Sequence, residues 1–208
     1  AMAVFEEHGA RVDRDTQIVR IPRELVMQAM SSVPRYFKVG SRSPETDFAL
    51  QEGYTYFCTD GCGHEVVDFY TRETRPSSKA DVGMMARVAD YLPSMAFYWP
   101  MVSAQNHGLT SPLHELDVSW SNTLKHVQSE TLMGAELARY GIEMATVIAG
   151  SKEALRENPV FSVIICTIAP LVQDKEGIEG AMLLAEAGVP VGFLAMPTLG
   201  TTGPATLA

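Results

Sequence analysis

Phe161-Ser-Val-Ile-Ile-Cys-Thr-Ile-Ala169 and Pro190-Val-Gly-Phe-Leu-Ala-Met196 are the two apolar runs of the stretch that decides the fold. Both are nearly unbroken and rich in β-branched residues, which is typical of strands buried on both faces of a parallel sheet. Between them, Asp174 can cap a helix, apolar residues recur at helical spacing, and Gly188 suits the helix end. Strand, helix and strand within about forty residues predict a βαβ unit.

The same alternation continues upstream. We predict strands at 96–104, 125–129, 160–169 and 191–196, and helices at 78–92, 111–124, 130–149 and 152–158. Four such units in about 130 residues predict the first half of a TIM (β/α)8 barrel, an α/β fold truncated here after about four strands. A doubly wound sheet can begin in the same way, but no G-x-G-x-x-G motif follows any of these strands.

Residues 1–76 follow a different pattern, and we expect them to form a small α+β N-terminal region before the barrel part at 77–208. A helix is predicted at 22–33, with four apolar residues on one face: Leu25, Val26, Ala29 and Met30. Short runs over 36–70 predict antiparallel hairpins, with Asp60-Gly61 as one turn. The first residues look like the end of a helix, and the last look like the first turn of another, so we expect a fragment of a longer protein.

Composition excludes several classes. The net charge of −9 leaves no basic stripe for nucleic acid. No signal peptide and no apolar run of membrane-spanning length occur, so we expect a cytoplasmic protein. Cys58, Cys62 and Cys166 form neither a disulfide framework nor a zinc ligand set, and we predict no metal site. The G-x-S-x-G and H-E-x-x-H motifs of hydrolases and metalloproteases are missing.

Ligands of such folds bind at the carboxyl ends of the strands, so we searched there for site residues. No catalytic residue can be identified. The Gly-rich turn after the fourth strand offers hydroxyls and backbone N–H groups to an anion or carboxylate. His107 is explained equally well as a solvated loop histidine. Lys125-His126 begins a strand, at the opposite end from the ligand side, and a structural role is favoured for it. The predicted substrate-binding residues are Gln105, His107, Gln128, Thr167, Met196, Thr201 and Thr202.

Tyr98 and Trp99 are adjacent aromatic residues in the first barrel strand. One of them can form a wall of an aromatic box for a quaternary or tertiary amine through cation–π attraction. Neighbouring side chains of a strand point to opposite faces, so at most one of the two rings faces inward. Core packing is the default explanation for both.

Several segments resemble the trimethylamine methyltransferase family, and they occur in the same order over nearly the whole chain. The most specific is Gly200-Thr-Thr-Gly-Pro-Ala-Thr-Leu-Ala208. The supporting segments are Ile21-Pro22 with the helix after it, Tyr54–Gly63, Arg72-Glu-Thr-Arg-Pro76, Lys125-His126 and Phe161-x-x-x-x-Cys166-x-Ile-x-Pro170-Leu.

The resemblance implies a TIM barrel with N-terminal additions. Members of this family transfer a methyl group from a methylated amine to the cobalt of a corrinoid (cobalamin), which a small partner protein carries. Some members contain pyrrolysine in the second half of the barrel, and others demethylate quaternary amines such as glycine betaine. We transfer no catalytic residue, and we expect a homo-oligomer whose first half is inactive alone.

Two alternatives stay open. The chain can be a non-catalytic half-barrel that serves as a binding or assembly module through its open strand edge. It can also belong to an unrelated TIM-barrel enzyme such as a lyase or aldolase, although these usually place a lysine or metal ligands at the strand ends.

Overall fold

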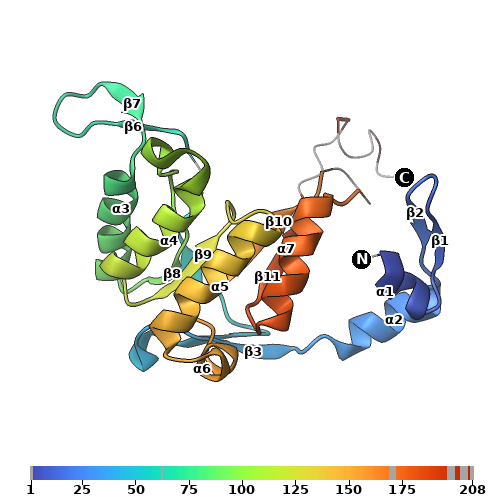
Figure 1. Ribbon diagram of the computed structural model, residues 1–208. Coiled ribbons are helices and arrows are strands. Elements are labelled where there is room, and N and C mark those ends of the chain that lie inside the picture. Colours follow the sequence, from blue (N-terminus) through green and yellow to red (C-terminus); the bar gives the residue numbers. More distant parts are fainter. Residues whose placement is uncertain (1, 62, 169–171, 196–199, 202–205, 207–208) are drawn as a thin grey trace. The chain divides into compact units, whose positions relative to one another are not determined.

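A computed structural model describes residues 2–61, 63–168, 172–195, 200–201 and 206 of the chain (Figure 1). The chain divides into two compact units. One comprises Ala1–Phe37 with Leu50–Glu52, and the other Lys38–Ala49 with Gly53–Ala208. The sequence-based boundary near residue 76, with domains at 1–76 and 77–208, stays a prediction.

The smaller unit is built from local structure. Helix α1 (Met2–Glu7) precedes a hairpin of β1 (Arg11–Asp13) and β2 (Ile18–Arg20), which pair antiparallel. Helix α2 (Arg23–Ser32) follows, as predicted, and Pro22 stands at its N-cap position. No residue of α2 is buried, and Met30 is 64% exposed, so its apolar face is not part of a core.

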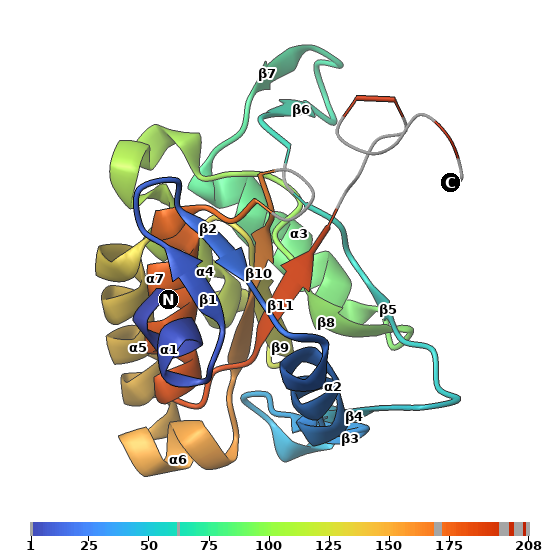
Figure 2. The ribbon, with the colours of Figure 1, turned by 90° about the vertical axis from the view of Figure 1, so that its right-hand side faces the viewer.

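The larger unit contains a curled sheet of five parallel strands in the order β11-β10-β9-β8-β5. Four of them match the predicted strands and alternate with helices, which is consistent with a truncated (β/α) barrel. Figures 1 and 2 show α5 and α7 side by side along one face of this sheet. The strands are β5 (Phe57–Cys58), β8 (Met95–Tyr98), β9 (His126–Ser129), β10 (Phe161–Cys166) and β11 (Val191–Leu194).

The helices between the strands start and end at recognisable signals. Ser78 precedes α3, and its N–H and hydroxyl both donate to Asp81. Ser151 caps α6, Asp174 caps α7, and Gly150 ends α5 with a φ of 92°. The helices are α3 (Lys79–Tyr91), α4 (Ser111–Asn122), α5 (Ala135–Ala149), α6 (Lys152–Glu157) and α7 (Lys175–Glu186), with 3-10 turns η1 (Pro44–Thr46) and η2 (Gln105–Thr110).

The hairpins agree only in part with the prediction. Strand β3 (Tyr36–Val39) pairs with β4 (Phe48–Gln51), within the range 36–70 where hairpins are predicted. Strand β6 (Glu65–Val67) pairs antiparallel with β7 (Thr74–Pro76), which lies beyond that range. Strand β5 instead joins the main sheet parallel to β8, so the prediction of a hairpin turn at Asp60-Gly61 is wrong. The β-strand propensity of residues 57–58 does not predict which strand they pair with, because that pairing is a long-range contact.

Two predicted boundaries also change, and both lengthen the loops at the strand ends. Strand β8 ends at Tyr98 rather than at residue 104, since Pro100 has no N–H for a ladder. Helix α5 begins at Ala135 rather than at Glu130. Gly134 before it has a φ of 85°, outside the helical region, so residues 130–134 form a loop after β9.

The main core lies between the sheet and the helices. On β10, Phe161, Val163 and Ile165 are buried in that core, while the alternate residues are only half-buried. The predicted burial on both faces therefore holds for one face, because the five described strands curl without closing on themselves. Among the described helices, none is long and apolar enough to cross a membrane.

Aromatic side chains cluster where β8 and β9 pair. The rings of Phe48 and Phe97 stack with their centroids 5.7 Å apart, and the imidazole of His126 packs edge-on against both. Phe97 and His126 are partners in the register of the two strands. Ligands of barrel folds bind at the carboxyl ends of the strands, so the loops at that edge are described next.

Candidate functional site at the strand ends

The carboxyl ends of β5, β8 and β9 meet at one edge of the sheet, because the strands are parallel neighbours. The three loops that follow cover residues 59–64, 99–104 and 130–134. Thr59 ties the first loop to the second: its hydroxyl donates to the Trp99 carbonyl at 2.6 Å, and it accepts the Trp99 N–H at 2.8 Å.

Tyr98 and Trp99 leave β8 on opposite faces, as the alternation of a strand requires. Tyr98 is fully buried in a core cluster with Val82, and its hydroxyl donates to the Val82 carbonyl at 2.9 Å. Burial raises the pKa of Tyr98 well above its usual value. Trp99 is 9% exposed, and its indole Nε1 lies close to Gly61. The role of either ring as a wall of an aromatic box stays a prediction.

Trp99 and Glu130 are the polar side chains that converge in this region. The indole Nε1 of Trp99 and the carboxylate Oε1 of Glu130 are buried, and neither has a hydrogen-bond partner within the described part of the chain. Both atoms face Gly61. A Cβ added to Gly61 would lie 3.0 Å from Trp99 Nε1, 3.1 Å from Glu130 Oε1 and 2.2 Å from the carbonyl oxygen of Pro100. Any side chain at this position would displace the Pro100 carbonyl, so the close packing here requires glycine.

Glu115 holds the surrounding loops in place. This buried carboxylate accepts the N–H of Ala104 at 3.0 Å, the hydroxyl of Ser111 at 2.9 Å and that of Thr131 at 2.6 Å. Ala104 lies in the loop after β8, and Thr131 adjoins Glu130 after β9. One carboxylate therefore links the two loops that carry Trp99 and Glu130.

Two of the substrate-binding residues predicted from the sequence, Gln105 and His107, contact other side chains or loops of the chain. The Gln105 amide donates to the His64 carbonyl and, at 3.1 Å, to Ser77 Oγ, which holds the loop after β8. His107 stacks on His114 with a centroid distance of 3.6 Å. Burial, then the neighbouring His107 and Lys79, lower the pKa of His114, while Asp117 opposes the shift.

Of the other predicted residues, Gln128 and Thr167 are half-buried and Thr201 is exposed. Gln128 pairs in register with Ser162 of β10. The backbone N–H of Thr167 donates to the Leu194 carbonyl. Met196 and Thr202 lie outside the described residues. The substrate-binding assignments of all these residues stay predictions.

Sequence reasoning missed Glu130 and the role of Gly61. The sequence pattern predicts Glu130 as the first residue of a helix and Gly61 as part of a hairpin turn. The available signal was Gly134, which lies four residues after Glu130 and is a poor helix residue.

Comparison with known proteins identifies the family to which the chain is related. A family model described as trimethylamine methyltransferase (MTTB) matches residues 1–208. The chain belongs to the trimethylamine methyltransferase family. The resemblance noted in the sequence is therefore confirmed.

Three curated relatives show the range of the family. Trimethylamine methyltransferase MttB of Desulfitobacterium hafniense (strain DSM 10664 / DCB-2) is 34% identical over 209 residues, covering 100% of this chain and 42% of the relative. The protein of the same name from Methanosarcina thermophila is 26% identical, covering 100% and 44%. Glycine betaine methyltransferase of Desulfitobacterium hafniense (strain Y51) is also 26% identical, covering 100% and 43%. The chain thus spans about two fifths of the length of these relatives.

Lys125 and His126, which lie in one of the family-like segments, have structural contacts. The Lys125 ammonium donates to the carbonyls of Ala89 and Leu92, both at 2.7 Å, near the end of α3. The His126 ring lies between the Gly40 carbonyl at 2.7 Å and Ser162 Oγ at 2.8 Å. Burial lowers the pKa of His126 to about 4, so the ring is neutral at physiological pH.

Within the described residues, no group of three or more His, Cys, Asp or Glu side chains could hold a metal ion. Cys58 and Cys166 are free thiols, and burial raises the pKa of Cys58, which disfavours a reactive thiolate. Cys62 lies outside the described residues.

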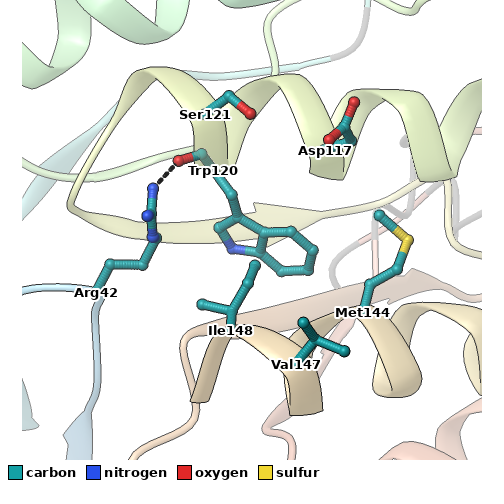
Figure 3. A pocket seen from close by; sticks show the side chains of 7 residues that line it. All are labelled: Arg42, Asp117, Trp120, Ser121, Met144, Val147 and Ile148. Atoms are coloured by element: carbon teal, nitrogen blue, oxygen red, sulfur yellow. Dashed lines mark hydrogen bonds between the residues drawn. The ribbon is translucent and has the colours of Figure 1, made fainter. Parts of the chain in front are cut away.

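A surface cleft of about 350 Å³ lies elsewhere, between α4 and α5 (Figure 3). Arg42 borders it and donates to the Trp120 carbonyl. The lining residues are Arg42, Asp117, Trp120, Ser121, Met144, Val147 and Ile148. This cleft belongs to the helical layer rather than to the strand ends, so it is a weaker candidate for the active site.

Proposed function

We propose that this chain forms the substrate-binding part of a methyltransferase that moves a methyl group from a methylated amine to the cobalt of a corrinoid carried by a partner protein. The match to the family over all 208 residues is the observation that carries this proposal. The names of the relatives support trimethylamine and glycine betaine as the two donor classes to test.

The proposed methyl transfer requires little acid–base catalysis by the protein. A methyl group on a positively charged nitrogen already has a neutral amine as its leaving group, and the corrinoid supplies the nucleophile as a second substrate. The task of this chain is to bind the amine, hold its methyl group toward the acceptor and exclude water. The concave sheet and its strand-end loops suit that task.

The strand-end site supports the proposal because it combines a carboxylate, an indole and short polar loops. A carboxylate attracts an ammonium group, and an aromatic ring can add cation–π attraction. We include Gln105, His107, Gln128, Thr167, Met196, Thr201 and Thr202 as proposed lining residues.

A methyl-transfer assay with purified proteins tests this function. The protein, produced at the full length of its relatives, is mixed with its reduced corrinoid partner and either trimethylamine or glycine betaine, and methyl–cobalt formation is followed by absorbance. We expect transfer from at least one donor and none from glycine, which has no N-methyl group. No transfer from any methylated amine, with folded protein and a corrinoid that another methyl donor can alkylate, would contradict the proposal.

A further inference from the structure

The cleft between α4 and α5 combines an apolar wall with a single guanidinium group (Figure 3). Its volume of about 350 Å³ lies at the lower end of the range of small-molecule sites, which are mostly apolar with a few polar groups. Met144, Val147 and Ile148 of α5 form one side of the cleft. Trp120 of α4 forms the other, and Figure 3 shows its ring between Arg42 at one end and Met144 at the other.

The walls of this cleft are fixed by contacts with the rest of the chain. Trp120 is only 3% exposed, and its ring packs edge-on against Phe161 with the centroids 5.6 Å apart. The Arg42 side chain donates to the Trp120 carbonyl, and the Arg42 N–H donates to the Leu124 carbonyl at 2.9 Å. Val147, in contrast, is 81% exposed. A ligand in the cleft would therefore cover an apolar side chain that now faces water, against walls that need little ordering.

The guanidinium groups beside the cleft have no counter-ion. Arg42 forms no ion pair within the described residues. A second cleft of about 280 Å³ adjoins the first, because Arg42 and Ser121 line both, and it adds Arg87. Arg87 donates to Asn122 Oδ1 at 2.7 Å and likewise has no ion pair in the described part of the chain. A guanidinium group binds a carboxylate through parallel N–H donors, so an anion is the complementary ligand here.

The two carboxylates that line these clefts already have partners. Asp117 pairs with the Lys79 ammonium at 2.5 Å. Asp90 accepts the hydroxyl of Thr123 at 2.7 Å and the N–H of Leu124 at 2.9 Å. Two carboxylates against one ammonium and two guanidinium groups leave one positive charge around the clefts, in a chain whose net charge is −9. The local charge therefore favours an anion, and the apolar wall favours one with a hydrocarbon part.

We propose that the cleft between α4 and α5 binds a small carboxylate with an apolar body, such as a short-chain fatty acid. Its carboxylate accepts hydrogen bonds from the Arg42 guanidinium, and its hydrocarbon part covers Trp120, Met144 and Val147. The cleft lies in the helical layer rather than at the strand ends. It is therefore a second ligand site, and its existence does not depend on the proposed methyl transfer.

Tryptophan labelled with ¹⁵N gives a direct readout in the protein produced at the full length of its relatives. The variants Trp99→Phe and Trp120→Phe assign the Nε1–H signals of the two indoles. We expect hexanoate to shift the Trp120 signal until it saturates and to leave that of Trp99 unchanged, since Trp99 does not line the cleft. Hexanol has the hydrocarbon part without the charge and acetate has the charge without the hydrocarbon part, so each should bind about threefold or more weakly.

Two substitutions separate the charge from the apolar wall. Arg42→Gln should weaken the binding of hexanoate about three- to fivefold, the effect of an exposed ion pair, and leave that of hexanol unchanged. Unchanged hexanol binding also shows that the cleft of this variant is still folded. Val147→Asp should weaken the binding of both molecules, and the exposure of Val147 makes the change tolerable for the fold. Arg139→Gln removes the same charge from an exposed position of α5 outside the cleft, and should bind like the unmodified protein.

Three results would overturn the site. An unchanged Trp120 signal at saturating hexanoate means that the cleft does not bind such a ligand. Equal binding of hexanoate and hexanol, or unaltered hexanoate binding by Arg42→Gln, contradicts the recognition of a carboxylate. Parallel shifts of the Trp99 and Trp120 signals mean that hexanoate binds unspecifically. None of these measurements uses methyl transfer, so the failure of the proposed function and the failure of this site are told apart.

Discussion

At the residue scale, Gly61 is required by the packing of the loops that follow β5, β8 and β9. A Cβ at this position would lie 2.2 Å from the carbonyl oxygen of Pro100, which belongs to the backbone. A methyl group here would therefore have to displace that backbone.

We predict that Gly61→Ala lowers the free energy of unfolding by about 1–3 kcal/mol, the usual cost of overpacking. Urea unfolding measures it. The control is Gly192→Ala, whose Cβ would lie 3.3 Å from a flexible methylene of Ile164 and should cost less. Equal stability of the two variants would contradict the close approach at Gly61.

His126 makes a second prediction at this scale. Its folded pKa of about 4 lies below the 6.5 of an unfolded chain, so the unfolded state binds more protons between these values. Stability should therefore fall as the pH is lowered through this window, by an amount on the order of 3 kcal/mol. Urea titrations at several pH values should show a flatter dependence for His126→Gln, and parallel curves would show that another group causes the loss.

At the element scale, the start of α3 depends on a network of charges. Asp81 accepts two hydrogen bonds from Ser78 and two from the Arg75 guanidinium, at 2.8 and 2.9 Å. The hydrogen bonds from Arg75 contribute most to lowering the pKa of Asp81 to about 2. This stabilisation is complete above pH 4 and decreases as the pH falls toward 2.

We predict that Asp81→Ala destabilises the protein by about 1–3 kcal/mol, because the cap is lost and Ser78 loses an acceptor. Thermal or urea unfolding at pH 7 measures the change. Glu136→Ala is the matched control, since Glu136 lies in the first turn of α5 but is exposed. A similar loss in both variants would point to a general effect of charge near a helix start.

At the scale of the whole molecule, the sheet should show graded stability. Strands β9 and β10 have a partner on each side, whereas β5 and β11 are the edges of the described sheet. Phe193 on β11 is 55% exposed, while Phe161 and Val163 on β10 are buried. Amide hydrogen exchange of the 208-residue chain should therefore be slowest in β9 and β10. Equal protection of β11 would show that its edge is covered.

The amino-acid sequence by itself determined the repeating elements, because helix and strand periods, caps and glycine stops are local properties. It supplied Ser78, Ser151, Asp174, Gly150 and Gly188 as boundaries, four of the five strands, and the family. The partner of β5 and the end of β8 depended on long-range pairing and could not be deduced locally.

Only the tertiary structure brought Gly61, Trp99 and Glu130 together. They are far apart along the chain, and their common feature is close packing around two buried polar atoms that have no partner within the described residues. Local patterns report which face of an element is apolar, but they do not report which polar atoms lack a partner. That depends on how three parallel strands place their ends at one edge of the sheet.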